Sequence, residues 1–182
     1  MKEPPLPDFS AHDLQGHVAQ LFVYPVKSCA GVSLQEAELT ATGLAHDRAW
    51  MVVDGQGVFR TQRELPRMAL VRPELLADAL ALHAPGMAAL RVPYGATSVT
   101  TTAVRVWNDT VPAWDMGEPA AQWFSAFLGQ PCRLVRFVPT HRRLSSFQWT
   151  GGVEAVNQFA DGYPVLIASQ ASLDGLNARL AA

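Results

Sequence analysis

The stretch Arg48-Ala-Trp-Met-Val-Val-Asp-Gly-Gln-Gly-Val-Phe-Arg-Thr61 holds the pattern that decides the fold. Its first half, Arg48–Asp54, is rich in aromatic and β-branched residues, which favour strands. Asp54-Gly55-Gln56-Gly57 then predicts a tight turn, after which Val58–Thr61 should pair back onto the first strand. We therefore expect a β-hairpin in the first half of the chain.

Short strand signals continue on both sides of this hairpin, with turn residues between them. We expect strands over Val18–Val26, Leu34–Thr40, Met68–Val71, Ala79–His83, Leu90–Val92, Val99–Trp107, Val111–Trp114 and Arg133–Val138. Turns roughly every 8–12 residues are typical of a small barrel or sandwich. Apolar residues at helical spacing between Ala120 and Leu128, followed by Gly129, predict a helix that caps the β unit. The predicted fold class is mainly β with α (α+β).

Composition narrows the class of protein. The chain has 182 residues, of which 49% are hydrophobic and 16% charged. This balance favours a globular core. A net charge of -2 argues against a broad nucleic-acid-binding surface. Cys29 and Cys132 match no zinc spacing and favour a reducing compartment, so we predict a cytoplasmic protein. No apolar run approaches the roughly 20 residues of a membrane span.

The chain divides into three predicted parts. Residues 1–16 hold three prolines and few apolar residues, which predicts a flexible tail. Residues 17–138 should form one β-barrel-like domain together with its capping helix. Residues 139–182 should form an interdomain loop, long and polar up to Gly162, and then the start of a second domain.

The beginning of the second domain is predicted from the end of the sequence. Pro164–Ala168 is a continuous apolar run, typical of a strand buried on both faces. Ser169 is a good N-cap for a helix whose apolar stripe is formed by Leu173, Leu176 and Leu180. Because little chain remains to cover that strand, we expect a larger domain to follow. The alternative is that both elements pack back onto the barrel.

Two segments present cations that could bind an anion. In Tyr24-Pro-Val-Lys-Ser-Cys29, the proline ends the strand and places Lys27 and Ser28 in a loop, where an ammonium, a hydroxyl and free amides can cradle an anion. Arg48 offers a planar guanidinium that suits phosphate or a fused polar ring. The alternatives are an ordinary solvated Lys27, a surface pair of Arg48 with Asp47, or packing of Arg48 across Trp50.

A third segment, Phe159-Ala-Asp-Gly-Tyr-Pro164, precedes the apolar run. Gly162 permits close approach of a ligand to the backbone, and Tyr163 can donate a hydrogen bond. The alternative is a plain turn. Four arginines, Arg60, Arg63, Arg67 and Arg72, add local positive charge, which we interpret as a solvated face. The five histidines are scattered, and we assign no catalytic residue and no metal ligand.

Several stretches, taken in order, resemble the MOSC family, in particular its group of mitochondrial amidoxime-reducing components and their bacterial relatives. They are Tyr24–Gly31, Thr42–Leu44, Asp47–Trp50, Thr61–Arg63, Ala120–Trp123, Phe159–Pro164 and Ser169–Asn177. The resemblance covers about Val18 to Leu180 and implies an N-terminal β-barrel domain followed by a truncated start of the MOSC β-barrel domain.

The resemblance also implies a function. In the family, a pterin-based molybdenum cofactor (molybdopterin) lies between two domains, and the matching grip residues are Lys27, Ser28 and Arg48, with Gly162 and Tyr163 touching the cofactor from the second domain. It implies reduction of N-oxygenated compounds, with electrons from an iron–sulfur, haem or flavin partner. The family's molybdenum-binding cysteine, which follows an Arg-Pro-Asn segment, has no counterpart here. We therefore expect an inactive fragment that binds no cofactor securely and needs the missing C-terminal MOSC half as its partner.

Two other hypotheses remain open from the sequence. The chain could be a non-catalytic binding module or a sulfur-carrier docking module. It could also bind a small anion or pyridoxal phosphate, in which case Lys27 would form a Schiff base that borohydride reduction traps.

Overall fold

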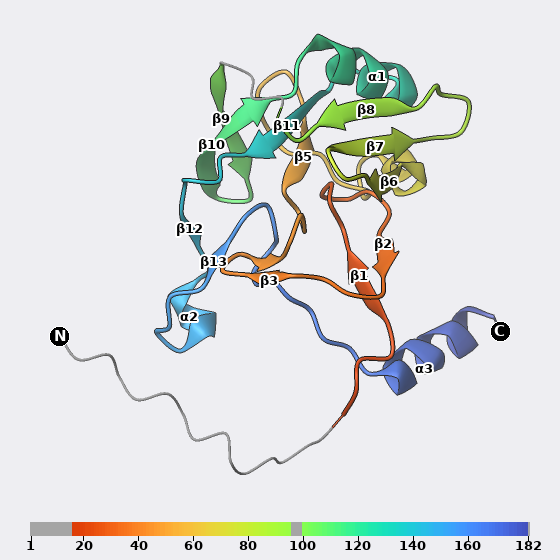
Figure 1. Cartoon of the computed structure of the whole chain (residues 1–182), viewed down its shortest axis with the longest axis vertical. Coiled ribbons are helices and arrows are strands. Elements are labelled where there is room, and N and C mark those ends of the chain that lie inside the picture. Colours follow the sequence, from red (N-terminus) through yellow and green to blue (C-terminus); the bar gives the residue numbers. More distant parts are fainter. Residues whose placement is uncertain (1–15, 96–99, 182) are drawn as a thin grey trace.

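The computed structural model describes residues 16–95 and 100–181 (Figure 1). The tail predicted over residues 1–16 lies outside the described residues except for Gly16, and so does Val99 of one predicted strand.

Short antiparallel sheets dominate the described chain. The largest has four strands in the order β5 (Trp50–Val53), β11 (Arg133–Phe137), β10 (Asp109–Asp115) and β9 (Thr101–Val106). A second sheet has the order β6 (Arg72–Leu75), β7 (Ala79–His83) and β8 (Leu90–Pro93). The strand pairs are β1 (Leu21–Val23) with β2 (Val32–Leu34), β3 (Leu39–Thr40) with β4 (Gly43–Leu44), and β12 (Arg143–Leu144) with β13 (Val156–Asn157). The mainly β class with helices is confirmed, although the described sheets do not close into a barrel.

Strand β5 is buried on both faces and connects two apolar clusters. Trp50 and Val52 point into the larger cluster, which includes the inner face of α1 (Glu118–Leu128). Met51 and Val53 point into the smaller cluster, on the other face of the sheet. The hairpin after β5 is confirmed, because the Arg60 amide donates to the Val52 carbonyl at 2.8 Å. Burial of four successive side chains explains why this strand could be predicted from the sequence.

Helix α1 caps the β unit as predicted. It packs over β8 and β11 at the top of Figure 1. Gly129 ends it in the left-handed conformation, with φ of 74°. An L-residue with a Cβ is disfavoured in that conformation. The apolar spacing from Ala120 to Leu128 thus correctly indicated both the helix and its buried face.

Two strand predictions need correction. Met68–Val71 lies mostly in a 3₁₀-helix, η1 (Pro66–Leu70), because its buried side chains, Met68 and Val71, are three residues apart rather than two. The strand that follows, β6, is an edge strand and tolerates Pro73 within it. The expected strand over Leu34–Thr40 is two separate strands, β2 and β3, which pair with different partners.

The hairpin between β9 and β10 turns one residue earlier than predicted. Asp109 already pairs with Val106, so the loop consists of Trp107 and Asn108 alone. Trp107 has a positive φ of 54°. An aromatic residue rarely adopts this conformation, so the surrounding structure must hold the turn in place.

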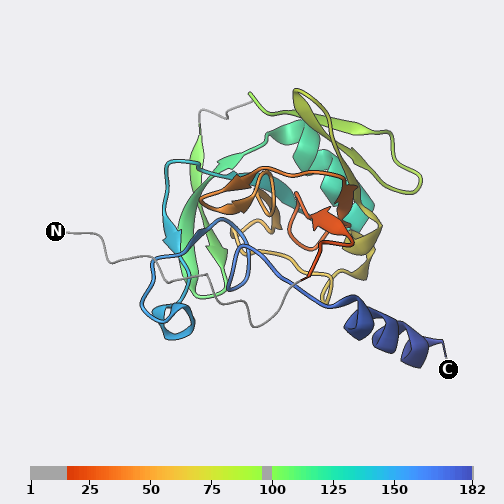
Figure 2. The same cartoon turned by 60° about the horizontal axis from the view of Figure 1, so that its bottom comes forward.

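The end of the chain differs most from expectation. Pro164–Ala168 forms no strand, because its backbone pairs with no strand of the described chain; Pro164 lies close to Gly43 of β4, but Leu166 and Ile167 are 86% and 90% exposed. Ser169 does cap helix α3 (Gln170–Leu180), accepting from the Ser172 amide at 3.1 Å. The helix buries no residue and stands away from the sheets in Figures 1 and 2. Packing of these elements back onto the β unit is therefore not observed.

Residues 140–162 were expected to be irregular but contain a small ordered unit. Besides β12 and β13 it holds the short helix α2 (Phe147–Thr150). Arg143 lies at its centre, only 7% exposed. Its guanidinium donates to Asp109 at 2.7 Å, to the Asn157 side chain at 2.6 Å and to the carbonyls of Gln158 and Ala160 at 2.9 and 2.6 Å. One buried side chain therefore holds the 157–160 loop against the β9–β10 hairpin.

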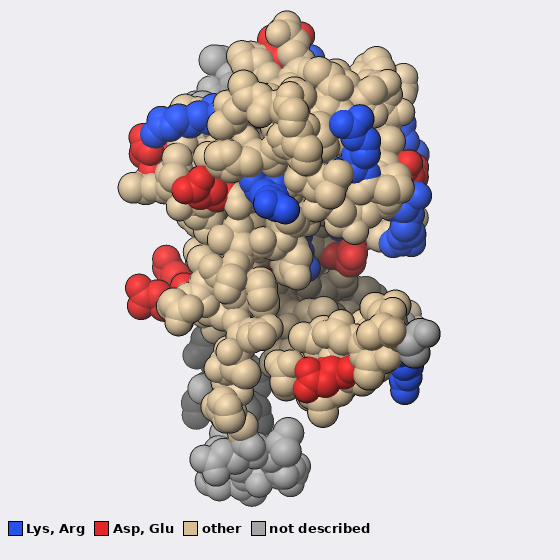
Figure 3. Space-filling view, turned by 90° about the vertical axis from the view of Figure 1, so that its right-hand side faces the viewer, with Lys and Arg blue, Asp and Glu red and all other residues tan. Residues whose placement is uncertain are grey.

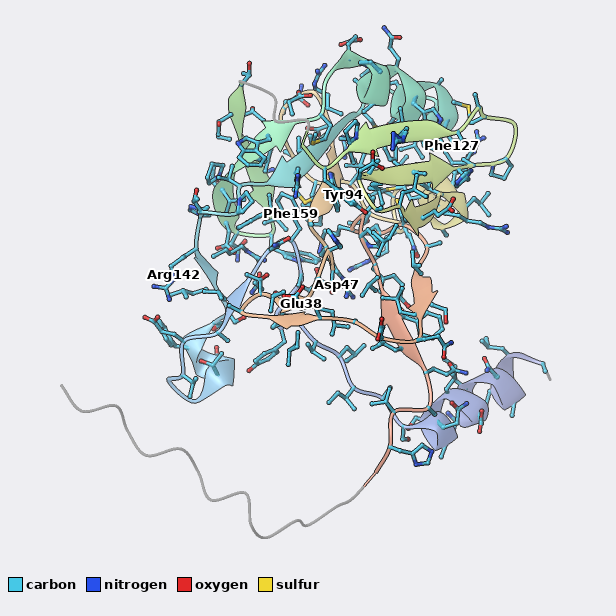
Figure 4. All side chains as sticks on the ribbon, viewed as in Figure 1. Glu38, Asp47, Tyr94, Phe127, Arg142 and Phe159 are labelled. Carbon is cyan, nitrogen blue, oxygen red and sulfur yellow. The ribbon has the colours of Figure 1, made fainter. Side chains whose placement is uncertain are left out.

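We predict that Arg143→Met destabilises the fold far more than Arg142→Met. The first change leaves buried carbonyl groups without donors, which should lower the free energy of unfolding by about 2–4 kcal/mol. Arg142 is exposed, contacts only Glu154 at 2.6 Å and lies at the periphery in Figure 4. Its loss should therefore change stability by less than about 0.5 kcal/mol. Urea unfolding of both variants measures the difference, and equal losses would contradict the assigned role.

Candidate functional site

Backbone hydrogen bonds join three loops at the start of β5. The amides of Lys27 and Arg48 donate to the carbonyls of Trp50 and Tyr24, both at 2.8 Å. The Phe159 amide donates to the Arg48 carbonyl at 3.1 Å. Segments far apart in the sequence therefore converge at one end of this strand, and Figure 4 shows Asp47 and Phe159 near the middle of the molecule.

A pocket of about 300 Å³ lies where these loops meet. It is lined by Tyr24, Lys27, Ser28, Cys29, Arg48, Thr61, Gln62, Arg63, Trp107 and Asp161. Three of the predicted site residues, Lys27, Ser28 and Arg48, are thus brought together. Gly162 and Tyr163 do not line the pocket, although they directly follow Asp161, which does.

Backbone strain is concentrated at this pocket. The non-glycine residues with positive φ in the described chain are Ser28 (65°), His46 (67°), Arg48 (48°) and Trp107 (54°). Three of the four line the pocket. Such conformations persist only where the surrounding structure holds them, and they are common at ligand sites.

Lys27 is buried, with 6% of its surface exposed, which argues against an ordinary solvated lysine. Its ammonium donates to the Phe159 carbonyl at 2.8 Å and forms a close ion pair with Asp161. Burial lowers the pKa of Lys27 below its ordinary value, and the hydrogen bond and charge of Asp161 oppose that shift only in part. The charged form is therefore less favourable here than in water.

Arg48 pairs with Asp47, but not as a surface pair, because the Asp47 side chain is only 4% exposed. The same carboxylate accepts from the Tyr24 amide at 2.7 Å. The Arg48 guanidinium lies 4.8 Å from the centroid of the Tyr24 ring, close enough for a cation–π contact. The alternative of packing across Trp50 is wrong, because that ring is covered by Arg136 at 5.1 Å.

The sequence did not single out Asp161 and Trp107 as site residues. Asp161 also accepts from the Trp107 indole Nε1 at 2.8 Å. Burial would raise the pKa of Asp161, but the hydrogen bond and charge of Lys27, aided by Trp107, hold it below its ordinary value. The sequence signal that could have identified Asp161 was its position, as a carboxylate, inside the Phe159–Pro164 motif.

Of the four arginines interpreted as a solvated face, Arg72 is exposed on β6, and the other three have different roles. Arg63 lines the pocket, 5.7 Å from the centroid of the Trp107 ring, and makes no ion pair with a described carboxylate. Arg60 binds Asp54 at 2.8 Å, and Arg67 covers the Phe127 ring at 4.4 Å. Figure 3 shows Lys and Arg over the upper part of one face, with Asp and Glu among them, so positive charge is local rather than general.

Cys29 lines the pocket but is 2% exposed, and burial raises the pKa of its thiol far above the ordinary value. Burial therefore disfavours the thiolate, which is the form of cysteine that binds metals. The described residues contain no group of three or more His, Cys, Asp or Glu side chains placed to hold a metal ion. No described helix is long and apolar enough to cross a membrane.

We predict that Lys27→Met changes how stability depends on pH. Because the pKa of Lys27 is lower in the folded chain, between that lowered value and about 10.4 the unfolded chain holds a proton that the folded chain has released. The stability of the wild type should therefore rise with pH relative to Lys27→Met in this interval. Urea unfolding from neutral pH to about pH 10 tests this; a constant or falling difference would contradict the assignment.

Comparison with known proteins places the chain in a family. Residues 15–131 match the model of the MOSC N-terminal beta barrel domain. Mitochondrial amidoxime-reducing component 1 of Mus musculus is 41% identical over 175 residues, which cover 91% of this chain and 51% of the relative. The protein of the same name from Homo sapiens is 42% identical with the same coverage. This chain thus spans about half the length of these curated relatives.

Two further matches are more partial. Molybdenum cofactor sulfurase of Danio rerio is 38% identical over 136 residues, covering 71% of this chain and 16% of the relative. A solution structure of a Bordetella bronchiseptica protein is 29% identical, with a TM-score of 0.46, covering 58% of this chain and 91% of that one. Since the family model matches more than half of the sequence, the chain belongs to the MOSC N-terminal β-barrel family, and its curated relatives are molybdenum-cofactor-related proteins.

Proposed function

We propose that this chain grips a molybdenum cofactor through Lys27, Ser28 and Arg48, as part of a molybdenum-dependent oxidoreductase. The observation that carries the proposal is the convergence of three cations, Lys27, Arg48 and Arg63, on one pocket from separate loops. The family membership and the names of the relatives support the same interpretation.

The residues present fit the anionic pterin part of that cofactor. A phosphate group would meet two guanidinium groups, one ammonium and the Ser28 hydroxyl, a set of donors that suits bidentate and charge-assisted hydrogen bonds. Trp107 is 41% exposed and offers a flat apolar surface beside these donors for a planar ring. The pocket volume of about 300 Å³ suits part of such a ligand rather than all of it. Among the residues that line the pocket, Cys29 is the one thiol, and its burial disfavours the thiolate that a metal would need.

When bound, the cofactor supplies two-electron redox chemistry, and the protein positions it. Arg48, held by Asp47 and backed by the Tyr24 ring, has little freedom, so it fixes the orientation of the group that it contacts. Arg63 is restrained only by the Trp107 ring and can adjust to the ligand. Gly162 and Tyr163 remain proposed contacts on the open side of the pocket.

For the whole protein we propose reduction of N-oxygenated compounds, with electrons from a partner protein. The name of the relatives that match most of this chain, amidoxime-reducing component, supports this activity. The alternative is a sulfur-carrier docking module without a cofactor of its own, which the matches to molybdenum cofactor sulfurases support. Cofactor binding at this pocket would favour the first function, and its absence the second. A cytoplasmic location remains a prediction.

We predict that Arg48→Ala weakens binding of a phosphorylated pterin about 10- to 100-fold, since one charge-assisted contact is lost. Fluorescence anisotropy of the pterin, titrated with the purified chain, gives the dissociation constant. Arg91→Ala is the matched control, because Arg91 is exposed on β8 and pairs with Asp78 away from the pocket. Equal affinity of the wild type and Arg48→Ala would exclude the proposed grip.

The burial of Lys27 also bears on the pyridoxal phosphate hypothesis, since a lowered pKa favours the reactive amine. The chain has two lysines, Lys2 and Lys27, so the test is simple. After incubation with pyridoxal phosphate and borohydride, peptide mass analysis compares the two sites. Because the Lys27 ammonium is buried and donates to the Phe159 carbonyl, we expect no more label at Lys27 than at Lys2. Selective labelling of Lys27 would favour the rival function.

A further inference from the structure

The pocket contains a carboxylate of its own at the position where its donors converge. Asp161 accepts from both the Lys27 ammonium and the Trp107 indole Nε1. Its side chain is 68% exposed, whereas the Lys27 side chain is only 7% exposed. The lysine is therefore fixed in the interior, and the carboxylate reaches it from the solvent side.

The carboxylate that pairs with Arg48, behind the pocket lining, is bound differently. Asp47 is 4% exposed and holds the Tyr24 amide at 2.7 Å as well as Arg48, so its departure would leave buried groups unpaired. Asp161 has no such structural task among the described residues. If it swings away, Lys27 still donates to the Phe159 carbonyl.

The local backbone would also permit movement of Asp161. Arg143 binds the carbonyls of Gln158, Ala160 and Asp161 at 2.9, 2.6 and 3.5 Å, so the backbone is held as far as Asp161, whereas the Asp161 side chain takes no part in these contacts. Gly162 follows, and a Cβ placed on it would meet no atom within 4 Å. Asp161 thus lies at the junction between a fixed loop and an open one.

From this geometry we propose that Asp161 is a displaceable internal anion, which occupies Lys27 and Trp107 until an anionic ligand takes its place. The inference rests on the proposed anion-binding function and adds a regulation of the same site. The buried ammonium always keeps a counter-ion, which satisfies the requirement that a buried charge be paired. The ligand must compete with Asp161, so its apparent affinity is reduced by the fraction of chains in which the carboxylate remains bound. A doubly charged phosphate would compete better than a singly charged anion.

The first test measures inorganic phosphate binding by isothermal titration calorimetry to the wild type and to Asp161→Asn. The asparagine keeps the shape and can still accept from Trp107, but it carries no charge. We expect phosphate to bind about 10-fold more tightly to Asp161→Asn. Asp78→Asn is the control, because Asp78 is an exposed partner of Arg91 away from the pocket, and its affinity should equal that of the wild type.

The second test follows the indole N–H of Trp107 by two-dimensional ¹H–¹⁵N NMR. If phosphate displaces the carboxylate, the Trp107 resonance of the wild type shifts on titration as its acceptor changes. A purely electrostatic effect of a static Asp161 would strengthen binding in Asp161→Asn but leave this resonance of the wild type in place, and that outcome would overturn the proposal.

The outcomes also separate this inference from the proposed function. If Lys27→Met abolishes phosphate binding while Asp161→Asn leaves it unchanged or weaker, the pocket binds anions but Asp161 is no placeholder. If neither the wild type nor Asp161→Asn binds phosphate, the anion-binding function itself fails and the inference fails with it. Tighter binding by Asp161→Asn together with a shifted Trp107 resonance supports both.

Discussion

The double burial of β5 is the constraint on which the rest of the structure depends. Both faces of this strand must be covered by apolar side chains, so α1 is held on one side and the smaller cluster on the other. At the start of this strand, the carbonyls of Trp50 and Arg48 accept hydrogen bonds from the amides of Lys27 and Phe159. Both loop segments are therefore held at this end of the strand. The core thereby determines where the cations meet, although none of the cations belongs to the core.

The site at the start of β5 destabilises the folded state. Lys27 is desolvated, and three of its neighbours in the pocket have backbone conformations that other residues avoid. Such strain is retained when the surrounding structure enforces it. The compensating interactions lie nearby, in the buried Asp47 and in the guanidinium of Arg143, which together tie four loops into a rigid frame. Rigidity of the frame and mobility of one exposed carboxylate are compatible, because they involve different residues.

Much of the fold could be predicted because its determinants are local. The hairpin after β5, the helix α1 with its Gly129 stop, and the N-cap at Ser169 each depend on residues close together in the sequence. The predictions failed where the conformation of a segment depends on residues far away in the sequence. Whether Pro164–Ala168 forms a strand depends on a neighbouring strand, and the burial of Met68 and Val71 depends on the distant residues of the larger cluster that they meet.

The same distinction applies to the site. Lys27, Ser28 and Arg48 could be named because the motifs that contain them resemble those of a known family, whereas their local chemistry left other interpretations open. Asp161, Trp107 and Arg143 act through partners that are 134, 54 and 34 residues away, and no local pattern indicates such distances. The charge balance of the pocket is therefore a property of the tertiary structure alone.

The exposed Leu166 and Ile167 have a consequence for the behaviour of this chain in solution. They belong to a short, uncharged apolar segment whose backbone is not paired in any sheet of the described chain. Segments of this kind readily align with copies of themselves and form intermolecular β-structure. Association at high protein concentration would therefore begin at these residues, independently of the stability of the β unit.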